Sequence, residues 1–315
     1  MKIIKILFSL FLTTMMACSS SGSDVEDAIS DNNDNNPLEE TWITIPVPAN
    51  SGPGKKWEFQ KNISDNFEYD SPANNKGATF LDKWDDWYHN AWTGPEPTIF
   101  SREHSFVTNN ELNITAGRPI GTNNTNTGIV TSTNRVIYPV YIEARVKIMN
   151  STLANAVWLL SPDDTQEIDI VEAYGGDRFT NPWFGPKRVH LSHHVFIRQP
   201  FQDWQPNDEG SFYTDGQTVW RNDFHRYGVY WKDPWNLEYY IDGKLVRTRS
   251  GVAQIDPQDF TNGTGLSKEM DIIISAEDQT WRANQGLSPT NVEIENTANN
   301  TFKIDWIRVF KPIDN

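Results

Sequence analysis

Short runs with a period of two dominate this chain from residue 42 onward. Residues 140–149 (VYIEARVKIM) set apolar Ile142 beside charged Glu143 and continue the alternation to the end of the run. Successive side chains of a β-strand point to opposite faces, so the pattern predicts a strand with one buried and one solvated face. A chain built of such runs has to bury its apolar surface through sheets.

A second pattern, at residues 236–251, predicts two strands joined by Asp242-Gly243, a dipeptide typical of hairpin turns with positive φ at both central residues. Other apolar or alternating runs predict strands at residues 157–161, 166–173, 188–197, 226–231, 269–275 and 301–310. In the last of these runs, Trp306 shares the predicted buried face with Ile304.

Helical periodicity is scarce, and only residues 80–92 fit a turn or two of helix. Many short strands without intervening helices favour an all-β fold. About fourteen strands suit a two-sheet antiparallel β-sandwich (jelly roll) better than an immunoglobulin-like module, which takes about 100 residues. No repeat of about 20 to 50 residues recurs, which argues against a propeller or a solenoid. We expect residues 41–315 to form one domain.

The N-terminus is typical of a targeting segment. Lys2 and Lys5 precede an apolar stretch that is too short to span a bilayer, and Cys18 follows it. The stretch resembles a bacterial lipoprotein signal, which predicts a signal peptide at residues 1–17 and lipidation of Cys18. The alternative is an ordinary secretory signal with an incidental cysteine. Because Cys18 is the only cysteine, the domain has to fold without disulfides.

Residues 18–40 are predicted to be the lipidated cysteine and a flexible acidic tether. Residues 19–40 carry seven acids, no base and almost nothing apolar, so burial cannot offset their chain entropy. We expect an exported monomer that is lipid-anchored to the bacterial outer membrane at the cell surface and contacts the membrane through the lipid alone.

The charge of the chain limits its partners. It has 27 basic and 42 acidic side chains, and two of the bases and seven of the acids precede residue 41. The remaining body is therefore acidic as well, and it contains no basic run. Phosphate binding requires clustered Lys and Arg, so the composition excludes nucleic acid as the partner.

Residues 166–175 (QEIDIVEAYG) combine β-branched side chains with three carboxylates. On a regular strand Glu167 and Asp169 share one face, while Glu172 points away. A β-bulge at Ile170-Val171 would add one residue and return Glu172 to the face of the other two acids. The spacing therefore predicts either an idle third acid or a bulged strand with three aligned carboxylates.

Three aligned carboxylates suit retaining glycoside hydrolysis. In that reaction one carboxylate attacks the sugar carbon, and a carboxylic acid about 5 to 5.5 Å away protonates the leaving oxygen. Repulsion between close acids raises one pKa, which would keep the acid protonated near neutral pH. Glu167 would attack, Glu172 would be the acid and then the base, and Asp169 would adjust the proton balance. The alternative is a solvated strand face with accidental acids.

The segment TQEIDIVEAYG resembles the catalytic strand of the β-agarase and porphyranase branch of glycoside hydrolase family 16, and it is closest to β-agarase. Further segments are similar to β-agarase segments in the same order: residues 84–95, 138–161, 189–197, 233–247 and 270–282. The resemblance spans nearly all of residues 41–315. It implies a glycoside hydrolase domain with a concave substrate cleft, in which Glu167 is the nucleophile and Glu172 the acid/base.

Tryptophans are candidates for the walls of such a cleft, because sugar rings present flat C–H faces that stack on aromatic rings. The resemblance places Trp92, Trp158 and Trp281 there, although composition alone favours the core for each. We expect Trp158 to lie on a strand next to the acids.

Four further residues are implied to bind substrate by the resemblance. They are Arg118, His194, Arg198 and Glu277. The sequence around Arg118 departs from the β-agarase pattern, which leaves the substrate contacts on that side open. The alternative for Arg198 is a purely structural ion pair with Asp203.

The histidines of H-x-x-H-H do not predict a zinc site. Period two places His190 and His194 on one face and His193 on the other, and no second ligand cluster exists in the sequence. We expect no cofactor and no metal in the chemistry. The family allows a structural calcium far from the cleft, for which the sequence predicts no ligands.

The preferred hypothesis is an endo-acting hydrolase that cleaves β-1,4 linkages in agarose, an agar-type galactan, with retention. Porphyran, carrageenan and laminarin are alternative substrates. Porphyran is the runner-up and carrageenan is third, because an acidic body repels densely sulfated polymers, although salt screens this beyond about 8 Å and local arginines can override it. A non-catalytic agar-binding lipoprotein is the alternative from another class, since one fold can serve both roles.

Overall fold

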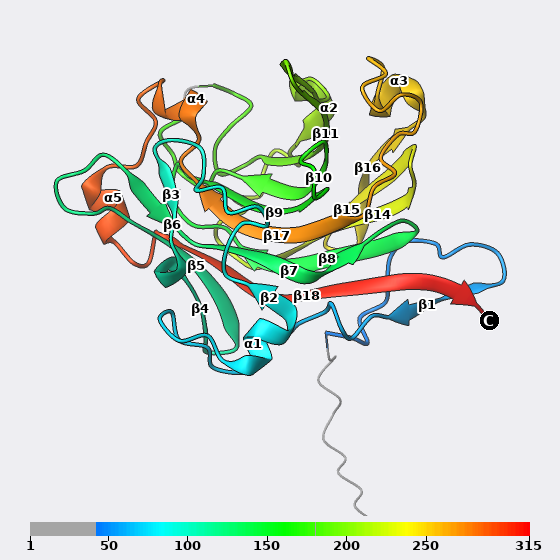
Figure 1. Ribbon diagram of the computed structural model, residues 1–315, viewed down its shortest axis with the longest axis horizontal. Helices are drawn as coiled ribbons and strands as arrows, with labels where there is room; N and C mark the ends of the chain where they lie inside the picture. The colour runs from blue at the N-terminus through cyan, green and yellow to red at the C-terminus, as the bar shows by residue number, and fades with distance from the viewer. Residues whose placement is uncertain (1–41, 180) are drawn as a thin grey trace, which may run out of the picture. The chain divides into compact units, whose positions relative to one another are not determined.

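The alternating runs pair into two stacked sheets in the computed structural model, which describes residues 42–179 and 181–315 (Figure 1). Pairing is antiparallel throughout these sheets except between β3 and β6. The predicted all-β sandwich is therefore confirmed. The predicted signal peptide, Cys18 and the acidic tether lie outside the described residues.

The larger sheet has ten strands. In spatial order they are β16 (Lys244–Ser250), β15 (Asn236–Ile241), β14 (His225–Asp233), β8 (Val140–Lys147), β18 (Thr301–Asp314), β5 (Glu111–Gly117), β6 (Thr125–Thr127) and β3 (Thr98–Phe100). Beside this path, β1 (Lys55–Phe59) pairs with β18, and β4 (Ser105–Thr108) pairs with β5.

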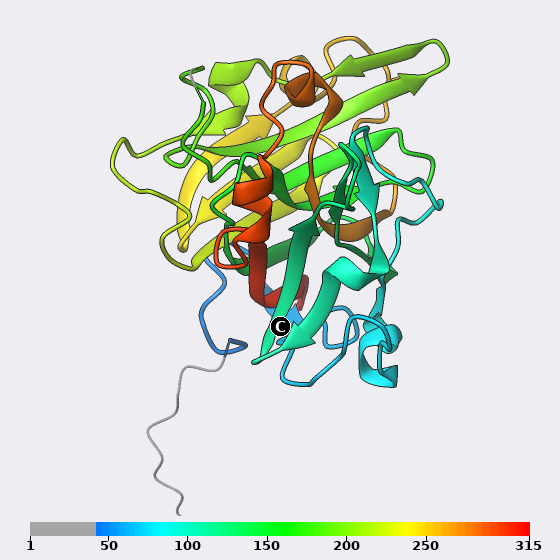
Figure 2. The same ribbon diagram turned by 90° about the vertical axis from the view of Figure 1, so that its left-hand side faces the viewer.

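The smaller sheet has eight strands. Their order is β12 (Phe201–Trp204), β11 (Val189–Arg198), β10 (Gln166–Ala173), β9 (Ala154–Leu160), β17 (Met270–Glu277), β7 (Ile129–Val136) and β2 (Trp84–Asp85), with β13 (Phe212–Tyr213) beside β11. The hairpin of β11 and β12 projects at the upper right in Figure 2 (light green).

Helices are short and few in the described chain. They are α1 (Ala78–Lys83), the 3-10 turn η1 (Arg102–His104), α2 (Asp208–Ser211), α3 (Val252–Ile255), α4 (Thr280–Ala283) and α5 (Asn291–Glu295). The helical turn expected within residues 80–92 corresponds to α1. No helix in the described part of the chain has the length and apolarity needed to cross a membrane.

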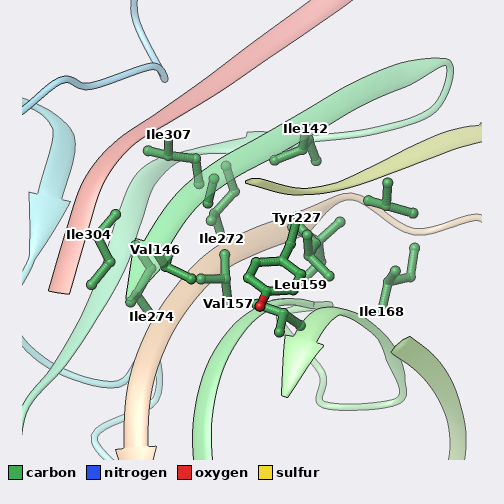
Figure 3. Close-up of a cluster of buried hydrophobic side chains, with 14 of the residues drawn as sticks. Ile142, Val146, Val157, Leu159, Ile168, Tyr227, Ile272, Ile274, Ile304 and Ile307 are labelled. Carbon is green, nitrogen blue, oxygen red and sulfur yellow. The ribbon is translucent and has the colours of Figure 1, made fainter. Parts of the chain in front are cut away.

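The core lies between the two sheets (Figure 3). Ile142 on β8, Leu159 on β9 and Ile272 on β17 point into it and have no exposed surface. Burying a side chain of this size stabilises the fold by about 1.5–3 kcal/mol. The predicted hairpin is also confirmed, because Asp242 and Gly243 adopt φ angles of 49° and 79° between β15 and β16.

Two sequence predictions about strand faces are wrong. Glu143, expected on a solvated face, is completely buried, because Arg308 pairs with it and the segment that begins at Trp42 covers both. Trp306 is buried but does not share a face with Ile304. A bulge in β18 between these two residues reverses the alternation, so Trp306 packs against Trp42 on the other side of the sheet.

The buried ion pair connects the start of the described chain to the centre of the larger sheet. Arg308 Nε donates to Glu143 Oε2 at 2.7 Å, and its Nη1 donates to the carbonyl oxygens of Trp42 and Ile45 at 3.0 and 2.6 Å. A buried charge is tolerated only when it is paired and hydrogen-bonded in this way.

Replacing Arg308 with methionine should destabilise the protein by about 3–5 kcal/mol, because Glu143 would remain buried without its partner. Equilibrium unfolding in urea measures this loss. Lys303→Met is the matched control on the same strand, since its ion pair with Glu111 is partly exposed and should contribute less than about 1 kcal/mol. Equal losses in both variants would contradict the prediction.

Candidate active site

The predicted bulge is present in β10. Asp169 pairs with Trp158 of β9, but the next pair joins Val171 to Val157, so Ile170 is the extra residue. Ile168, Ile170 and Val171 are completely buried in the core. The additional residue returns Glu172 to the face that carries Glu167 and Asp169, as the odd spacing predicted.

This face of the smaller sheet forms a cleft with two lobes. The three acids line both lobes together with Gln279, and the lobes enclose about 190 and 310 Å³. α2 and α4 stand above this side of the sheet in Figure 1. The first lobe is bounded by Tyr88, Trp92, Trp158, Phe196, Arg198 and Glu277, and the second by Tyr174, Phe184, His190, His194, Asp203 and Trp281.

Glu172 is held by three side chains. His190 Nδ1 lies 2.9 Å from its Oε2, while the Tyr174 hydroxyl and Gln279 Nε2 lie 2.9 and 2.8 Å from its Oε1. His190 faces Glu172 across the β10–β11 pair, and Tyr174 follows it by two residues. The sequence prediction missed all three as site residues, although strand pairing and period two place the first two beside Glu172.

Glu167 and Asp169 share a histidine instead. His194 Nε2 lies 3.8 Å from Glu167 Oε1 and 3.6 Å from Asp169 Oδ2, and its Nδ1 lies 2.9 Å from Asp203 Oδ1. Burial lowers the pKa of His194, but the Glu167, Asp203 and Asp169 carboxylates outweigh burial and raise it to about 10. His194 is therefore a cation that partly neutralises the acids.

The pKa values of the acids are not ordered as the sequence predicted. Burial and the Asp169 carboxylate raise the pKa of Glu167 well above its usual range. Burial also favours a raised pKa for Glu172, but the hydrogen bonds from His190, Tyr174 and Gln279 outweigh it and bring this pKa to about 2. In this structure the anion is thus favoured on Glu172, whereas we expected the raised pKa there.

All three predicted tryptophans line the cleft. Trp158 lies on β9, next to the acids as expected, and is only 8% exposed, with its Nε1 donating to Ser275 Oγ at 3.2 Å. Trp92 and Trp281 lie in opposite lobes with 42% and 43% of their surface exposed. Exposed indole rings at both ends of a cleft provide stacking surfaces for flat apolar faces.

The other predicted cleft residues are divided between the cleft and a separate hollow. His194, Arg198 and Glu277 line the cleft. Burial and Glu172 raise the pKa of Glu277 to about 8. Arg118 lines neither lobe. Its guanidinium bonds Asn291 Oδ1 and the Pro289 carbonyl in a separate hollow that Thr280 of α4 also borders.

The expected alternative pairing of Arg198 with Asp203 is wrong. Asp203 bonds His194, and the Arg198 guanidinium lies over the rings of Phe196 and Phe201 at 4.5 and 5.9 Å. No acceptor among the described residues bonds the Arg198 guanidinium, so its donors can meet a ligand in the first lobe, where its side chain is part of the lining.

The predicted division of the histidines is confirmed. His193 is completely buried and its Nε2 donates to the Ile255 carbonyl at 3.0 Å, whereas His190 and His194 line the cleft. Within the described residues, one group has the composition of a metal site, namely Glu167, Asp169 and His194, whose ligand atoms lie within 4.8 Å of one another. In this group His194 Nε2 faces both acids while its Nδ1 bonds Asp203.

A His89 bridge holds the loop of Trp92 against the turn before β10 and against β17. His89 Nε2 lies 2.6 Å from Asp164 Oδ1, before β10, and its Nδ1 lies 3.0 Å from Asp271 Oδ2 on β17. Carboxylates only accept hydrogen bonds, so both ring nitrogens carry protons and His89 is an imidazolium. Asn90 also donates to Asp164, at 2.7 Å.

This chain is similar to known proteins over most of its length. The family model described as "Beta-porphyranase A-D, GH16 domain" matches residues 57–312. Beta-agarase B of Zobellia galactanivorans is 58% identical over 88% of this chain and 84% of its own length, and a beta-agarase of Phocaeicola plebeius is 55% identical over 85% and 89%. The crystal structure of an inactivated mutant beta-agarase B in complex with agaro-octaose superposes with a TM-score of 0.84, covering 87% of this chain and all of that one at 57% identity.

Replacing His89 with glutamine should destabilise the protein most at acidic pH. Burial alone lowers the pKa of His89, but the bonds with Asp271 and Asp164 outweigh it and raise this pKa above its usual 6.5. A raised pKa means that the stabilisation is complete below about pH 6.5 and is lost as pH rises through the folded-state pKa. Urea unfolding should show that the loss caused by His89→Gln shrinks with rising pH, by up to about 1.4 kcal/mol per unit.

His104→Gln is the matched control for this experiment. Among the described residues the His104 ring bonds the Thr115 hydroxyl and no carboxylate, and burial lowers its pKa. The control should not show a loss that shrinks with rising pH. A pH-independent loss in His89→Gln would contradict the imidazolium bridge.

Proposed function

The chain belongs to glycoside hydrolase family 16, and from this premise we propose that it is an endo-acting β-agarase that cleaves β-1,4 linkages in agarose with retention. The observation that carries the proposal is the bulged strand β10, which brings Glu167, Asp169 and Glu172 to one face inside an aromatic-walled cleft. Relatives named β-agarases, at 55–58% identity, support the substrate.

The proposed reaction is a double displacement. Glu167 attacks the anomeric carbon while Glu172 gives a proton to the glycosidic oxygen, so the bond to the leaving sugar breaks and a glycosyl ester forms on Glu167. Glu172 then takes a proton from water, which attacks the same carbon and releases Glu167. Two inversions restore the original configuration, and the chemistry requires no cofactor.

Glu172 has to gain its proton from another group of the enzyme when the substrate binds. Its three hydrogen bonds favour the carboxylate, whereas burial keeps the pKa of Glu167 and of Asp169 raised. We propose that substrate binding transfers a proton from the Glu167–Asp169 side to Glu172. Asp169 lies between the two glutamates, and its Oδ2 has no hydrogen-bond partner among the described residues, which suits it to a transient role in this transfer.

The charge of the cleft favours a neutral galactan. Four carboxylates line the first lobe, at Glu167, Asp169, Glu172 and Glu277, and Arg198 is the one Lys or Arg among the described lining residues of either lobe. A sulfate ester in the first lobe would have Arg198 as its one arginine or lysine partner and would be repelled by the anionic Glu172. Porphyran remains the second candidate, because the matching family model is described as that of β-porphyranases.

A non-catalytic agar-binding protein is disfavoured by the acids. Crowding one buried and two half-buried carboxylates costs free energy that binding alone does not require. We further propose that the protein is an exported, lipid-anchored monomer attached through Cys18 to the outer membrane, facing the cell exterior. The signal-like N-terminus and the acidic tether in the sequence support this.

Replacing Glu167 with serine should lower the rate of agarose cleavage by at least about 10³-fold, because the attacking carboxylate is lost. Reducing-end formation measures cleavage, and retention on an agarose column should persist. Glu269→Ser, an exposed position on the same protein, serves as the control with normal cleavage. Near-normal turnover in Glu167→Ser would remove Glu167 as the nucleophile, and wild-type retention without cleavage would favour the binding protein.

Agarose should be cleaved at least about tenfold faster than porphyran, because Arg198 is the one arginine or lysine of the described cleft lining and the Glu172 carboxylate repels a sulfate ester. Product sizing over time on both polymers measures rate and mode together, with Glu167→Ser as the blank for each. Early products of mixed length indicate endo action. Faster cleavage of porphyran would overturn the proposed substrate but not the reaction.

A further inference from the structure

Arg282 is a buried cation that forms no ion pair with the described residues, and it lies behind Glu172, the proposed acid/base. Arg282 of α4 is only 1% exposed, yet its Nε and Nη1 have no hydrogen-bond partner among the described residues. The neighbouring Asp278 is bonded by the Thr125 and Ser288 hydroxyls. A desolvated guanidinium is costly, so an arginine kept here without such partners calls for another stabilising contact.

The contacts of Arg282 are aromatic. Its guanidinium carbon lies 4.2 Å from the centre of the Tyr174 ring and 4.9 Å from that of Phe179, with Trp281 at 5.8 Å. Cation–π attraction strengthens when the cation is desolvated, as it is here. Of the three rings, Tyr174 is the closest, so the cation restrains this ring most.

Tyr174 connects this cation to the reacting group. The ring is 3% exposed, and its hydroxyl lies 2.9 Å from Glu172 Oε1 and 3.0 Å from Gln279 Oε1. Trp281 Nε1 donates to the same Gln279 oxygen at 3.1 Å. Arg282 therefore contacts two of the aromatic rings that support the hydrogen bonds around Glu172.

We propose that Arg282 is a positioning residue: its cation holds the Tyr174 ring in place and polarises it, so that the hydroxyl fixes the Glu172 carboxyl group for proton transfer. This inference rests on the proposed function. A guanidinium on the ring face makes the phenol a stronger hydrogen-bond donor, and its own charge also favours the anionic form of Glu172.

The charged and titratable groups around this pair are known from the structure. Glu172 is faced by Glu167, Asp169, His190, Tyr174, Glu277 and Arg282, and Arg282 is faced by Tyr174, Glu172, Asp278 and Arg178. Because Arg282 opposes the carboxylates in this group, its removal should make Glu172 bind its proton more tightly.

The test compares pH profiles of kcat/KM on agarose oligosaccharides for the wild type, Arg282→Met and Arg282→Lys. The methionine variant should shift the alkaline limb upward by about 0.5–1 pH unit and lower kcat about tenfold, with KM within about twofold. Arg282→Lys, which keeps the charge, should recover most of the wild-type profile. Arg178→Met is the control, because Arg178 is paired with Glu293 at 2.8 Å, and its limb should stay in place.

A double-mutant cycle with Tyr174→Phe tests the path of the effect. If Arg282 acts through Tyr174, adding Arg282→Met to Tyr174→Phe should change kcat less than about twofold. An unshifted alkaline limb in Arg282→Met, or a full tenfold loss on top of Tyr174→Phe, overturns the inference. If the methionine variant does not fold, Arg282→Gln carries the same test. A wild type that does not cleave agarose would instead refute the proposed function.

Discussion

One additional residue in β10 is the constraint on which the site depends. Side chains alternate along a strand, so without Ile170 as an insertion Glu172 would point into the apolar core, where a carboxylate has no partner. The bulge is stabilised from the opposite side, since Ile168, Ile170 and Val171 are all buried between the sheets. Core packing on one face thus determines acid spacing on the other.

The crowded acids are tolerated because two different sets of neighbours stabilise them. Glu172 receives three hydrogen bonds, whereas Glu167 and Asp169 share the His194 cation, which Asp203 in turn stabilises. Different neighbours give the acids different pKa values. Chemically similar side chains need such a difference to act as acid and as nucleophile. The arrangement also leaves the proton on the side from which the proposed reaction has to move it.

Local sequence patterns predicted the fold and the three acids. The features that they did not predict depend on tertiary packing. Alternation, the Asp242-Gly243 turn and the odd spacing of the acids are properties of neighbouring residues, so they could be read from the sequence. Glu143 lies on the predicted face of its strand, but it is buried instead of solvated because its cover comes from residues about 100 positions earlier. Arg118 was placed in the cleft by resemblance, yet it lies across α4 in another hollow. The roles of Gln279 and Arg282 depend on strand order, which no local pattern specifies.

The hydrogen bonds between Arg308 and the first described residues have a mechanical consequence. The carbonyls of Trp42 and Ile45 both bond the Arg308 guanidinium, which belongs to the ten-stranded sheet. Tension applied to the chain before Trp42 would enter the domain at this point and be carried as shear along β18. β10 belongs to the other sheet, so this path of force along the backbone does not run through the strand that carries the three acids.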